Sequence, residues 1–334
     1  MVSLLPAGFV TAYGTALNIS RIIVLNPVHE QAFAHVARRL PGVTVQRLMG
    51  GAIGAALSLL ALLLAAKLRR RRVVFFHECC WPLFDILVGV VKPRGRFFPQ
   101  VTMSSFEQVS LADLPKPSGW KAWVQRQVLR AVGNQFVVYR TARDSADHGY
   151  NYSFSYRQYP DTIEIAPVGA RPAGTERAEA DRGEPTSSRA LTVLLITGTE
   201  PVPDDDLRAT YLALIDVAIA EGYAVHIKDH PLAKLGVPSA ACIHVDPTLP
   251  IELITERFAF AIGVASTGLM GAGDRKLSIL DMLNSMPDEA RRMRREHLLA
   301  LPGGDRVEFV ADLASVRTAL RQHRQAMADL AASR

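Results

Sequence analysis

A polar segment in the middle of the chain constrains the fold more than any other feature. Residues 169–190 read GARPAGTERAEADRGEPTSSRA and show no hydrophobic periodicity. A segment so rich in Gly, Pro, Ala and charge cannot bury a core face, so we expect it to be a linker. It divides the 334 residues into parts of roughly 168 and 144 residues, each close to the usual size of a domain. The chain is therefore predicted to hold two domains, residues 1–168 and residues 191–334.

Both parts alternate apolar strands with amphipathic helices. In the first part the expected strands are 21–27, 43–48, 73–78, 95–103, 135–140 and 162–167, and the expected helices are 29–40 and 119–133. In the second part the expected strands are 190–198, 223–229 and 258–266, and the expected helices are 206–222, 250–257 and a last one from Asp312. This alternation indicates an α/β protein with parallel sheets covered on both faces. We predict two Rossmann-like domains facing a central cleft, which loops at the carboxyl ends of the strands would line.

One uncharged apolar stretch, residues 50–66, is about the minimum length of a membrane span. The basic run that follows, Lys67 and then Arg69–Arg72, is typical of the cytoplasmic flank of a span. A buried or surface-lying crossover helix between strands 43–48 and 73–78 is nevertheless favoured, because a true span would cut the sheet in two. Basic residues at the end of such a helix would still hold the protein on anionic lipid.

Composition narrows the compartment and the partners. Three cysteines without a CxxC pair indicate neither a disulfide framework nor a metal site, so a reducing cytosol is expected. The opening MVSLLPAGFVTAYG has no basic segment before an apolar one, so no secretory signal is predicted. The net charge of +6 suits an anionic membrane surface or an anionic substrate. Nucleic acid is not expected as a partner, because no nucleic-acid-binding motif accompanies the charge.

Polar residues follow three successive strands of the second part. They are Gly198, Thr199 and Glu200 after the first strand, His230 and Pro231 after the second, and Ser266, Thr267 and Gly268 after the third. Hydroxyls and backbone N–H groups at such turns suit a phosphate, helped by the positive end of the next helix. A histidine beside them can donate a proton to a leaving phosphate. Each signal alone is common, since Ser-Thr before glycine is often only a helix cap. The ordered set predicts a phosphate site.

The segments KDHP, PIELI and GVASTGLM, within residues 197–271, resemble the donor-binding half of bacterial sialyltransferases and polysialyltransferases. Related enzymes transfer Kdo, and all of these families share a GT-B fold, an HP motif and a Ser-Ser/Thr motif. The resemblance implies that His230 contacts the phosphate of a CMP-sugar and acts as general acid. It implies that Ser266 and Thr267 bind the same phosphate, although Ala265 precedes them, and that Glu252 holds the ribose hydroxyls.

The resemblance completes the donor-binding set with residues from the same turns, namely Gly198, Thr199, Lys228, Pro231 and Gly268. No metal and no other cofactor is expected, because no DxD pair stands at a strand end. The acidic triplet Asp204–Asp206 fits the start of a helix.

The general base of these families, a carboxylate in an acidic pair followed by glycine, has no clean copy here. Glu78, at the end of an apolar strand in VVFFHECCWP, is the first candidate, because partial burial would raise its pKa toward that of a useful base. A solvated glutamate at the strand end is the alternative. Asp147, in ADHGY, is the second candidate, although Gly149 there also fits the stop of a short helix.

The sequence thus predicts a glycosyltransferase that moves sialic acid, Kdo or a related nonulosonic acid from its CMP form to a bacterial surface glycan. The acceptor would be a glycan or glycolipid of a capsule or lipopolysaccharide, and the enzyme would be cytoplasmic, or peripheral at the inner membrane face. Polyol-phosphate transferases for teichoic acids use a similar HP and Ser-Thr pattern, so a transferase acting on a CDP-polyol is one alternative. A non-catalytic membrane-surface protein that lacks the base is the other.

Overall fold

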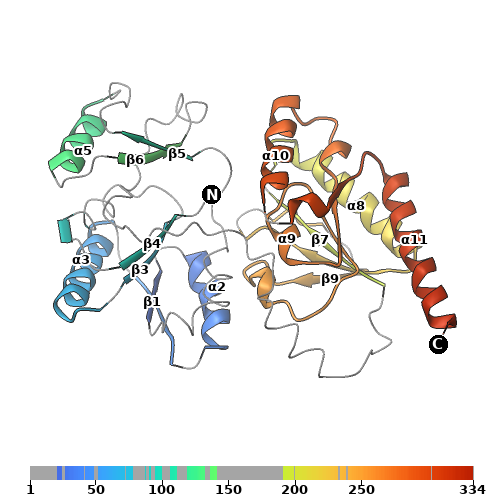
Figure 1. Cartoon of the computed structure of the whole chain (residues 1–334), viewed down its shortest axis with the longest axis horizontal. Helices are drawn as coiled ribbons and strands as arrows, with labels where there is room; N and C mark the ends of the chain where they lie inside the picture. Colours follow the sequence, from blue (N-terminus) through green and yellow to red (C-terminus); the bar gives the residue numbers. More distant parts are fainter. Residues whose placement is uncertain are drawn as a thin grey trace. The chain divides into compact units, whose positions relative to one another are not determined.

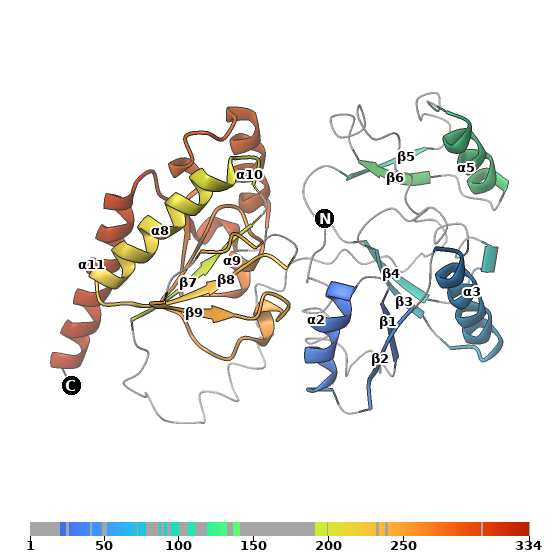
Figure 2. The same cartoon turned by 180° about the vertical axis from the view of Figure 1, so that it is seen from behind.

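The structure is a computed structural model. It describes residues 21–24, 27–40, 42–48, 52–71, 73–77, 87, 90–91, 95–99, 106–110, 119–131, 136–140, 191–198, 200–231, 234–237, 240–301 and 303–333. They group into two compact units, unit 1 within 21–30 and 44–165 and unit 2 within 31–43 and 166–334 (Figures 1 and 2). The expected linker and the expected strand 162–167 lie outside the described residues, so the predicted domain boundaries stay a prediction.

The described part of the first 140 residues contains three pairs of strands. The elements are β1 (Arg21–Val24), α2 (Pro27–Ala37), β2 (Thr44–Arg47), α3 (Ala52–Leu68), β3 (Val73–His77), β4 (Gly95–Pro99), β5 (Phe106–Ser110), α5 (Trp120–Ala131) and β6 (Phe136–Arg140). Strand β1 pairs with β2 and β3 with β4 in parallel, whereas β5 and β6 are antiparallel. The prediction of parallel pairing is therefore wrong for the last pair. Its strand β5 was not foreseen, because Glu107 and Gln108 interrupt its apolar pattern.

Helix α3 lies between β2 and β3 in the chain, but among the described residues these two strands belong to separate two-stranded sheets, so the predicted crossover within one sheet is not seen. Ala56, Leu59 and Leu63 on one of its faces are buried, and this face packs in a small core with Leu48 and Val91. Such a core explains why an almost wholly apolar helix forms here, since burying apolar surface is its main source of stability. Within the ranges that the structure describes, no helix is both long enough and apolar enough to cross a bilayer.

Unit 2 contains a six-stranded sheet with the strand order β12-β11-β10-β7-β8-β9. Its strands are β7 (Thr192–Ile196), β8 (Ala224–Lys228), β9 (Cys242–Val245), β10 (Phe260–Gly263), β11 (Arg275–Ser278) and β12 (Val307–Phe309). Its helices are α8 (Asp204–Ala220), η2 (Ile251–Leu253), α9 (Gly268–Gly271), η3 (Leu280–Met282), α10 (Asp288–Ala300), η4 (Gly304–Arg306) and α11 (Leu313–Ala332). All neighbouring strands are parallel. The predicted α/β class with a Rossmann-like parallel sheet is confirmed.

Helices cover both faces of this sheet. Val193 and Leu195 of β7 belong to the core beneath α8 and α11, whereas Leu194 and Ile196 belong to the core beneath α9 and α10. Successive side chains of a strand point to opposite faces. A strand buried on both faces therefore needs a continuous apolar run, which the sequence TVLLI provides.

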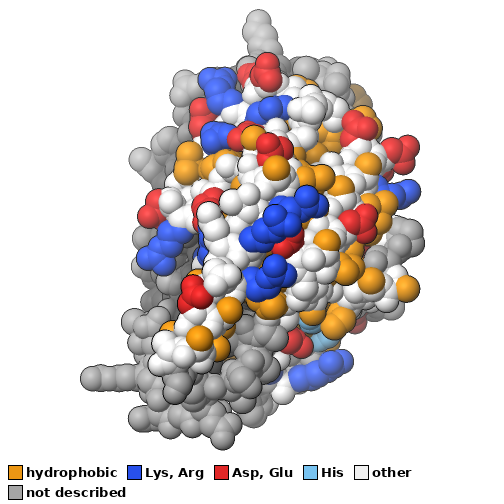
Figure 3. Space-filling view, turned by 90° about the vertical axis from the view of Figure 1, so that its right-hand side faces the viewer, with side chains coloured by type: hydrophobic (Ala, Val, Ile, Leu, Met, Phe, Trp, Pro, Cys, Tyr) orange, Lys and Arg blue, Asp and Glu red, His pale blue; other side chains and the backbone are white. Residues whose placement is uncertain are grey.

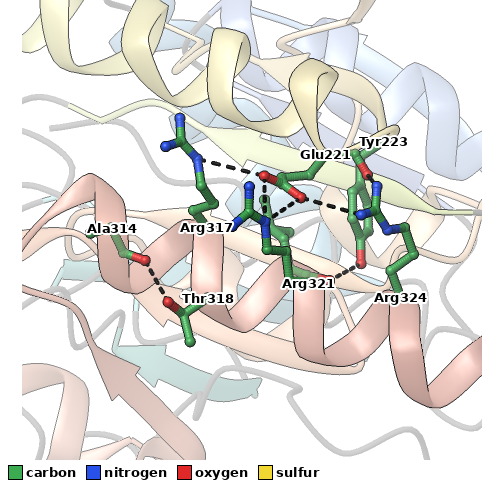
Figure 4. Close-up of polar contacts among 8 residues, drawn as sticks. Glu221, Tyr223, Ala314, Arg317, Thr318, Arg321 and Arg324 are labelled. Carbon is green, nitrogen blue, oxygen red and sulfur yellow. Dashed lines mark hydrogen bonds and ion pairs between the residues drawn. The ribbon is translucent and has the colours of Figure 1, made fainter.

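A buried carboxylate anchors α11 to the end of α8. Glu221 follows α8, and its side chain is only 4% exposed. It forms ion pairs with Arg317, Arg321 and Arg324 of α11 at 3.6, 2.9 and 3.6 Å (Figure 4). Figure 3 looks onto this end of unit 2, where basic and acidic side chains are intermingled. The hydrogen bond from Arg321, followed in importance by the charges of the three arginines, holds the pKa of Glu221 below its ordinary value.

Replacing Glu221 with glutamine is expected to lower the melting temperature near neutral pH, because the three arginines would lose their shared counter-charge. A lowered pKa means that the stabilisation is present above the unfolded-state pKa and is lost as the pH falls through the folded-state pKa. The difference between E221Q and wild type should therefore shrink in acid well below pH 4.5, as thermal unfolding at several pH values would measure. The exposed Glu296 gives a matched control, E296Q, which should change little. A difference that does not depend on pH would contradict this account.

Candidate functional site

The strand order of unit 2 contains one reversal. Counted along the chain from β7, the sheet reads 3-2-1-4-5-6 from one edge to the other, with β8 and β9 on one side of β7 and β10, β11 and β12 on the other. The crossover connections therefore diverge between β7 and β10. In open parallel sheets a ligand binds at this switch point, outside the carboxyl ends of the strands. The loops that follow β7, β8 and β10 are the ones that surround it.

The carboxyl ends of these three strands are level. Ile196, the last residue of β7, is paired with Lys228 of β8 and with Gly263 of β10. At Gly263 an added Cβ would lie only 2.9 Å from the Ile196 carbonyl oxygen, so glycine is needed where the two backbones approach. The residues that follow the three strand ends are therefore brought to one edge of the sheet.

A hydrogen-bond network fixes the backbone at His230. Thr197, which is buried, donates from its hydroxyl to Asp229 Oδ1 at 3.0 Å. The same hydroxyl accepts from the His230 N–H at 3.1 Å, and the Thr197 N–H donates to the Lys228 carbonyl at 3.0 Å. The ends of β7 and β8 are thus tied together, and His230 starts its loop from a fixed position.

Lys228 ends β8 and is buried. Its ammonium donates to the Pro247 carbonyl at 2.8 Å, which ties the end of β8 to the loop that follows β9. A structural role is therefore visible for this lysine. Its predicted role in donor binding stays a prediction.

The Ser-Thr turn follows β10 directly. Thr267, the N-cap residue of α9, makes no side-chain cap hydrogen bond. The Ser266 hydroxyl instead accepts from the Gly268 N–H at 3.2 Å within the turn. The contact leaves the hydroxyl hydrogen available to a ligand, because accepting a bond does not use it. Ile251 of η2 packs against this turn, since an added Cβ at Gly268 would lie 3.1 Å from its Cδ1 atom. The predicted ribose residue, Glu252, is the middle residue of η2.

The expectation that helix ends would attract the phosphate needs correction. Helix α9, which follows the Ser-Thr turn, is only four residues long, and so short a helix has little dipole. Helix α8, which follows β7 after a loop, carries Asp204–Asp206 in its first turn, and these carboxylates offset its positive end. Any phosphate at the switch point would therefore depend on hydroxyls, turn amides and the histidine.

A buried ion pair flanks the loop after β7. Glu200 pairs with Arg294 of α10, and their side chains are only 6% and 15% exposed. Burial raises the pKa of Glu200 above its ordinary value, while the charge of Arg294 opposes this rise. An added Cβ at Gly198 would lie 2.9 Å from Glu200 Oε1, so the carboxylate lies directly against the glycine turn.

Tyr211 of α8 contacts the last residue of β7. It is fully buried, and its hydroxyl donates to the Ile196 carbonyl at 2.6 Å. Burial raises the pKa of Tyr211, and the charges of Glu200 and Asp229 raise it further. The phenol therefore stays a neutral donor that satisfies the last carbonyl of β7.

The structure brings most of the predicted donor residues to one edge of the sheet. These residues are Gly198, Lys228, His230, Pro231, Ser266, Thr267 and Gly268. Since β8 and β10 are the two neighbours of β7, their ends are two strand spacings apart, roughly 10 Å. Thr199 and both candidate bases, Glu78 and Asp147, lie outside the described residues.

Three residues of this edge were not singled out from the sequence. Thr197 and Asp229 adjoin predicted site residues. Each follows an apolar strand, and this position at a strand end is the sequence signal that could have identified them. Arg294 lies 94 residues after Glu200, and no local pattern in α10 links the two. Only the packing of α10 on the sheet shows that Arg294 belongs to the site.

Comparison with known proteins gives likenesses of overall fold alone. No family model matches the sequence, and no curated protein matches it. Among solved structures, CalG4, the calicheamicin glycosyltransferase, is 15% identical over 96% of this chain and 88% of its own, with a TM-score of 0.42. The UDP-GlcNAc 2-epimerase of Methanocaldococcus jannaschii is 9% identical over 95% of this chain and 89% of its own, with a TM-score of 0.45.

A third similar structure is a 2,6-sialyltransferase of Photobacterium sp. JT-ISH-224, in complex with CMP and lactose. It is 11% identical over 93% of this chain and 76% of its own, with a TM-score of 0.44. Likenesses at these TM-scores do not assign an activity. The function of this chain therefore has to be inferred from its own residues.

Proposed function

We propose that the chain is a glycosyltransferase of GT-B-like architecture that uses a CMP-activated acidic sugar. Unit 2 would bind the nucleotide, and the domain predicted for residues 1–168 would bind the acceptor glycan or glycolipid at the inner membrane face. One observation carries the proposal. The 3-2-1-4-5-6 strand order puts His230 on one side of the switch strand β7 and the Ser266–Thr267 turn on the other.

The chemistry at this edge suits a single phosphate. Ser266 and Thr267 supply hydroxyl donors, and the backbone of the glycine turns at Gly198 and Gly268 allows close approach. His230 starts from a fixed backbone, because Thr197 accepts its N–H, and its imidazole can donate a proton to the departing CMP phosphate. A CMP-sugar carries one phosphate, so this set can stabilise the leaving group without a metal in the scheme.

The remaining roles follow the motif resemblance. Glu252, beside the Ser-Thr turn in η2, would hold the ribose hydroxyls. Glu78 is the first candidate for the base that deprotonates the acceptor hydroxyl, and Asp147 is the second. The sugar would be sialic acid, Kdo or a related nonulosonic acid.

Nucleotide release tests the proposal directly. The purified chain is incubated with CMP-sialic acid, CMP-Kdo or CDP-glycerol, and the release of CMP or glycerol phosphate transfer is followed. Turnover of a CMP-sugar is the expected result. Turnover of CDP-glycerol alone would instead favour the polyol-phosphate transferase, and neither binding nor turnover of any donor would favour a non-catalytic surface protein.

Nucleotide binding provides a second readout that does not need the acceptor. A ligand present at about 100 times its Kd stabilises the folded state by about 2.7 kcal/mol, so CMP should raise the melting temperature more than UMP or GMP does. Thr267→Val should weaken CMP binding on the order of tenfold, because a hydrogen bond to a charged group is lost. Thr318→Val is the matched control, since that hydroxyl donates to Ala314 within α11 (Figure 4). Equal binding by both variants would argue against a phosphate at the Ser-Thr turn.

A further inference from the structure

One face of α3 is apolar and exposed. Ile53, Leu57, Leu64 and Leu68 are 76%, 62%, 44% and 83% exposed. At 3.6 residues per turn, their spacing of four, seven and four residues puts them on one stripe of the helix. This stripe differs from the face that packs into the core of unit 1. A helix that buries one apolar face and exposes another needs a second apolar environment.

The end of the same helix is strongly basic. Lys67 donates to the Val91 carbonyl at 2.6 Å, which fixes the helix end to the rest of unit 1. Arg69, Arg70 and Arg71 follow and are exposed. The sequence from Ala52 to Arg71 contains no Asp or Glu. The exposed stripe is therefore followed in the sequence by three arginines, and no acidic residue lies between Ala52 and Arg71 to offset their charge.

Arg70 occupies a backbone position that favours glycine. Its φ is 51°, and the chain closes the helix there with hydrogen bonds from the Arg70 N–H to the Lys67 carbonyl and from the Arg71 N–H to the Ala66 carbonyl, at 3.1 and 2.9 Å. Glycine is the usual residue in this left-handed cap, because a Cβ is strained in it. Compared with glycine, arginine at this position costs stability but adds a positive charge.

A second helix of unit 1 has the same character. Trp120, Trp123 and Val124 of α5 are 72%, 55% and 40% exposed, and their spacing of three and one residues puts them on one face. Basic residues, among them Lys121 and Arg130, accompany them in the sequence. Tryptophan is enriched where a protein meets the lipid headgroups. Helices α3 and α5 lie on the same side of unit 1 in both views (Figures 1 and 2).

We propose that these exposed faces of α3 and α5 form a surface that docks on an anionic bilayer. The apolar stripe and the tryptophans would enter the headgroup region, and Arg69–Arg71 would lie against lipid phosphates. Charge decides between this occupant and a second copy of the chain. A second copy of this stretch offers no acidic residue to the arginines, whereas an anionic bilayer satisfies both the charge and the apolar surface. The inference refines the membrane location given above and does not depend on the transferase activity.

Vesicle binding tests the surface. The full chain is mixed with vesicles of phosphatidylcholine, or of phosphatidylcholine with phosphatidylglycerol, and followed by flotation and by a blue shift of tryptophan emission. We expect at least tenfold stronger partitioning to the anionic vesicles, since each basic residue near such a surface contributes about fivefold. Added salt should weaken it. Equal partitioning to both vesicle types, or none, would overturn the proposal.

Variants of the apolar stripe locate the surface. Leu57→Ser with Leu64→Ser should reduce partitioning at least tenfold. The matched control is Leu299→Ser with Leu330→Ser, which are 49% and 50% exposed in unit 2 and should change nothing. Equal effects of the two pairs of substitutions on partitioning would overturn the proposal. It would also be overturned if the chain forms a dimer without lipid and Leu57→Ser with Leu64→Ser abolishes that dimer.

Arg70→Gly separates a lipid role from a structural one. It should lower partitioning about fivefold while the melting temperature stays the same or rises, because the strained cap is relieved. Arg292→Gln, at a 67% exposed side chain of α10, is the control and should bind lipid like wild type. Unchanged lipid binding by R70G would contradict the proposed contact between Arg69–Arg71 and lipid phosphates. All these variants should still release CMP with a soluble acceptor, so failure of the docking surface and failure of the transferase proposal are distinguishable.

Discussion

His230→Ala is expected to lower the rate of sugar transfer from a CMP-donor by roughly 10²- to 10⁴-fold, the usual contribution of a positioned general acid. The imidazole follows the end of β8, one strand from the switch point, and Thr197 holds its backbone N–H at 3.1 Å. Without it the departing CMP would leave with an unneutralised phosphate charge. Single-turnover measurement of CMP release would show the loss, and it should appear in kcat more than in KM.

His226 provides a matched control for this prediction. It lies in β8, four residues before His230, and its ring packs edge-on against Phe258 at a centroid distance of 5.1 Å. His226→Gln should therefore leave transfer close to wild type. Thr197→Val, which removes the hydroxyl that positions the His230 backbone, should fall between the two. A His230→Ala enzyme that keeps wild-type turnover would exclude the imidazole as the acid.

Arg294→Met is expected to destabilise the protein by about 3–5 kcal/mol near neutral pH, because it leaves the buried Glu200 carboxylate without its counter-charge. Both side chains are largely buried, so water cannot replace the lost partner. Burial already raises the pKa of Glu200, and loss of the arginine should raise it further. The penalty is present above the folded-state pKa of Glu200 and is relieved as the pH falls toward 4.5.

The double variant Glu200→Gln with Arg294→Met separates the charge effect from lost packing. With both charges removed, stability should recover much of the loss, and the pH dependence of R294M should disappear. Urea unfolding of the four proteins at two pH values gives the coupling energy of the pair. A double variant as unstable as R294M at every pH would mean that packing of Arg294, not its charge, stabilises the site.

Prediction from sequence succeeded where one segment is buried on two sides. The apolar runs of β7 and β10 were recognised, and so were α8 and α11, because burial imposes a pattern that a short window reveals. It failed at β9, β11 and β12, since strands of three or four residues give too short a pattern, and RKLS of β11 also has little apolar character. The order of the strands was not predicted, because helices that cover opposite faces have similar patterns.

Some residues of the candidate site could be predicted from the sequence and others could not. His230 and the Ser266–Thr267 pair could be found from the sequence, because each directly follows an apolar strand. Arg294 could not be found, since its relation to Glu200 depends on where α10 packs. The bases Glu78 and Asp147 stay predictions.

The amino-acid pattern alone was enough to predict that the second half of this chain is an α/β domain with polar residues at its strand ends. Uninterrupted apolar strands can be stable only between two layers of helices, and the turns after them must carry the polar groups. The folded chain was needed to show that β7 lies between β8 and β10, and that Glu200 pairs with Arg294. Strand order and helix placement arise from packing between segments far apart in the chain, and no local pattern records which of them will meet.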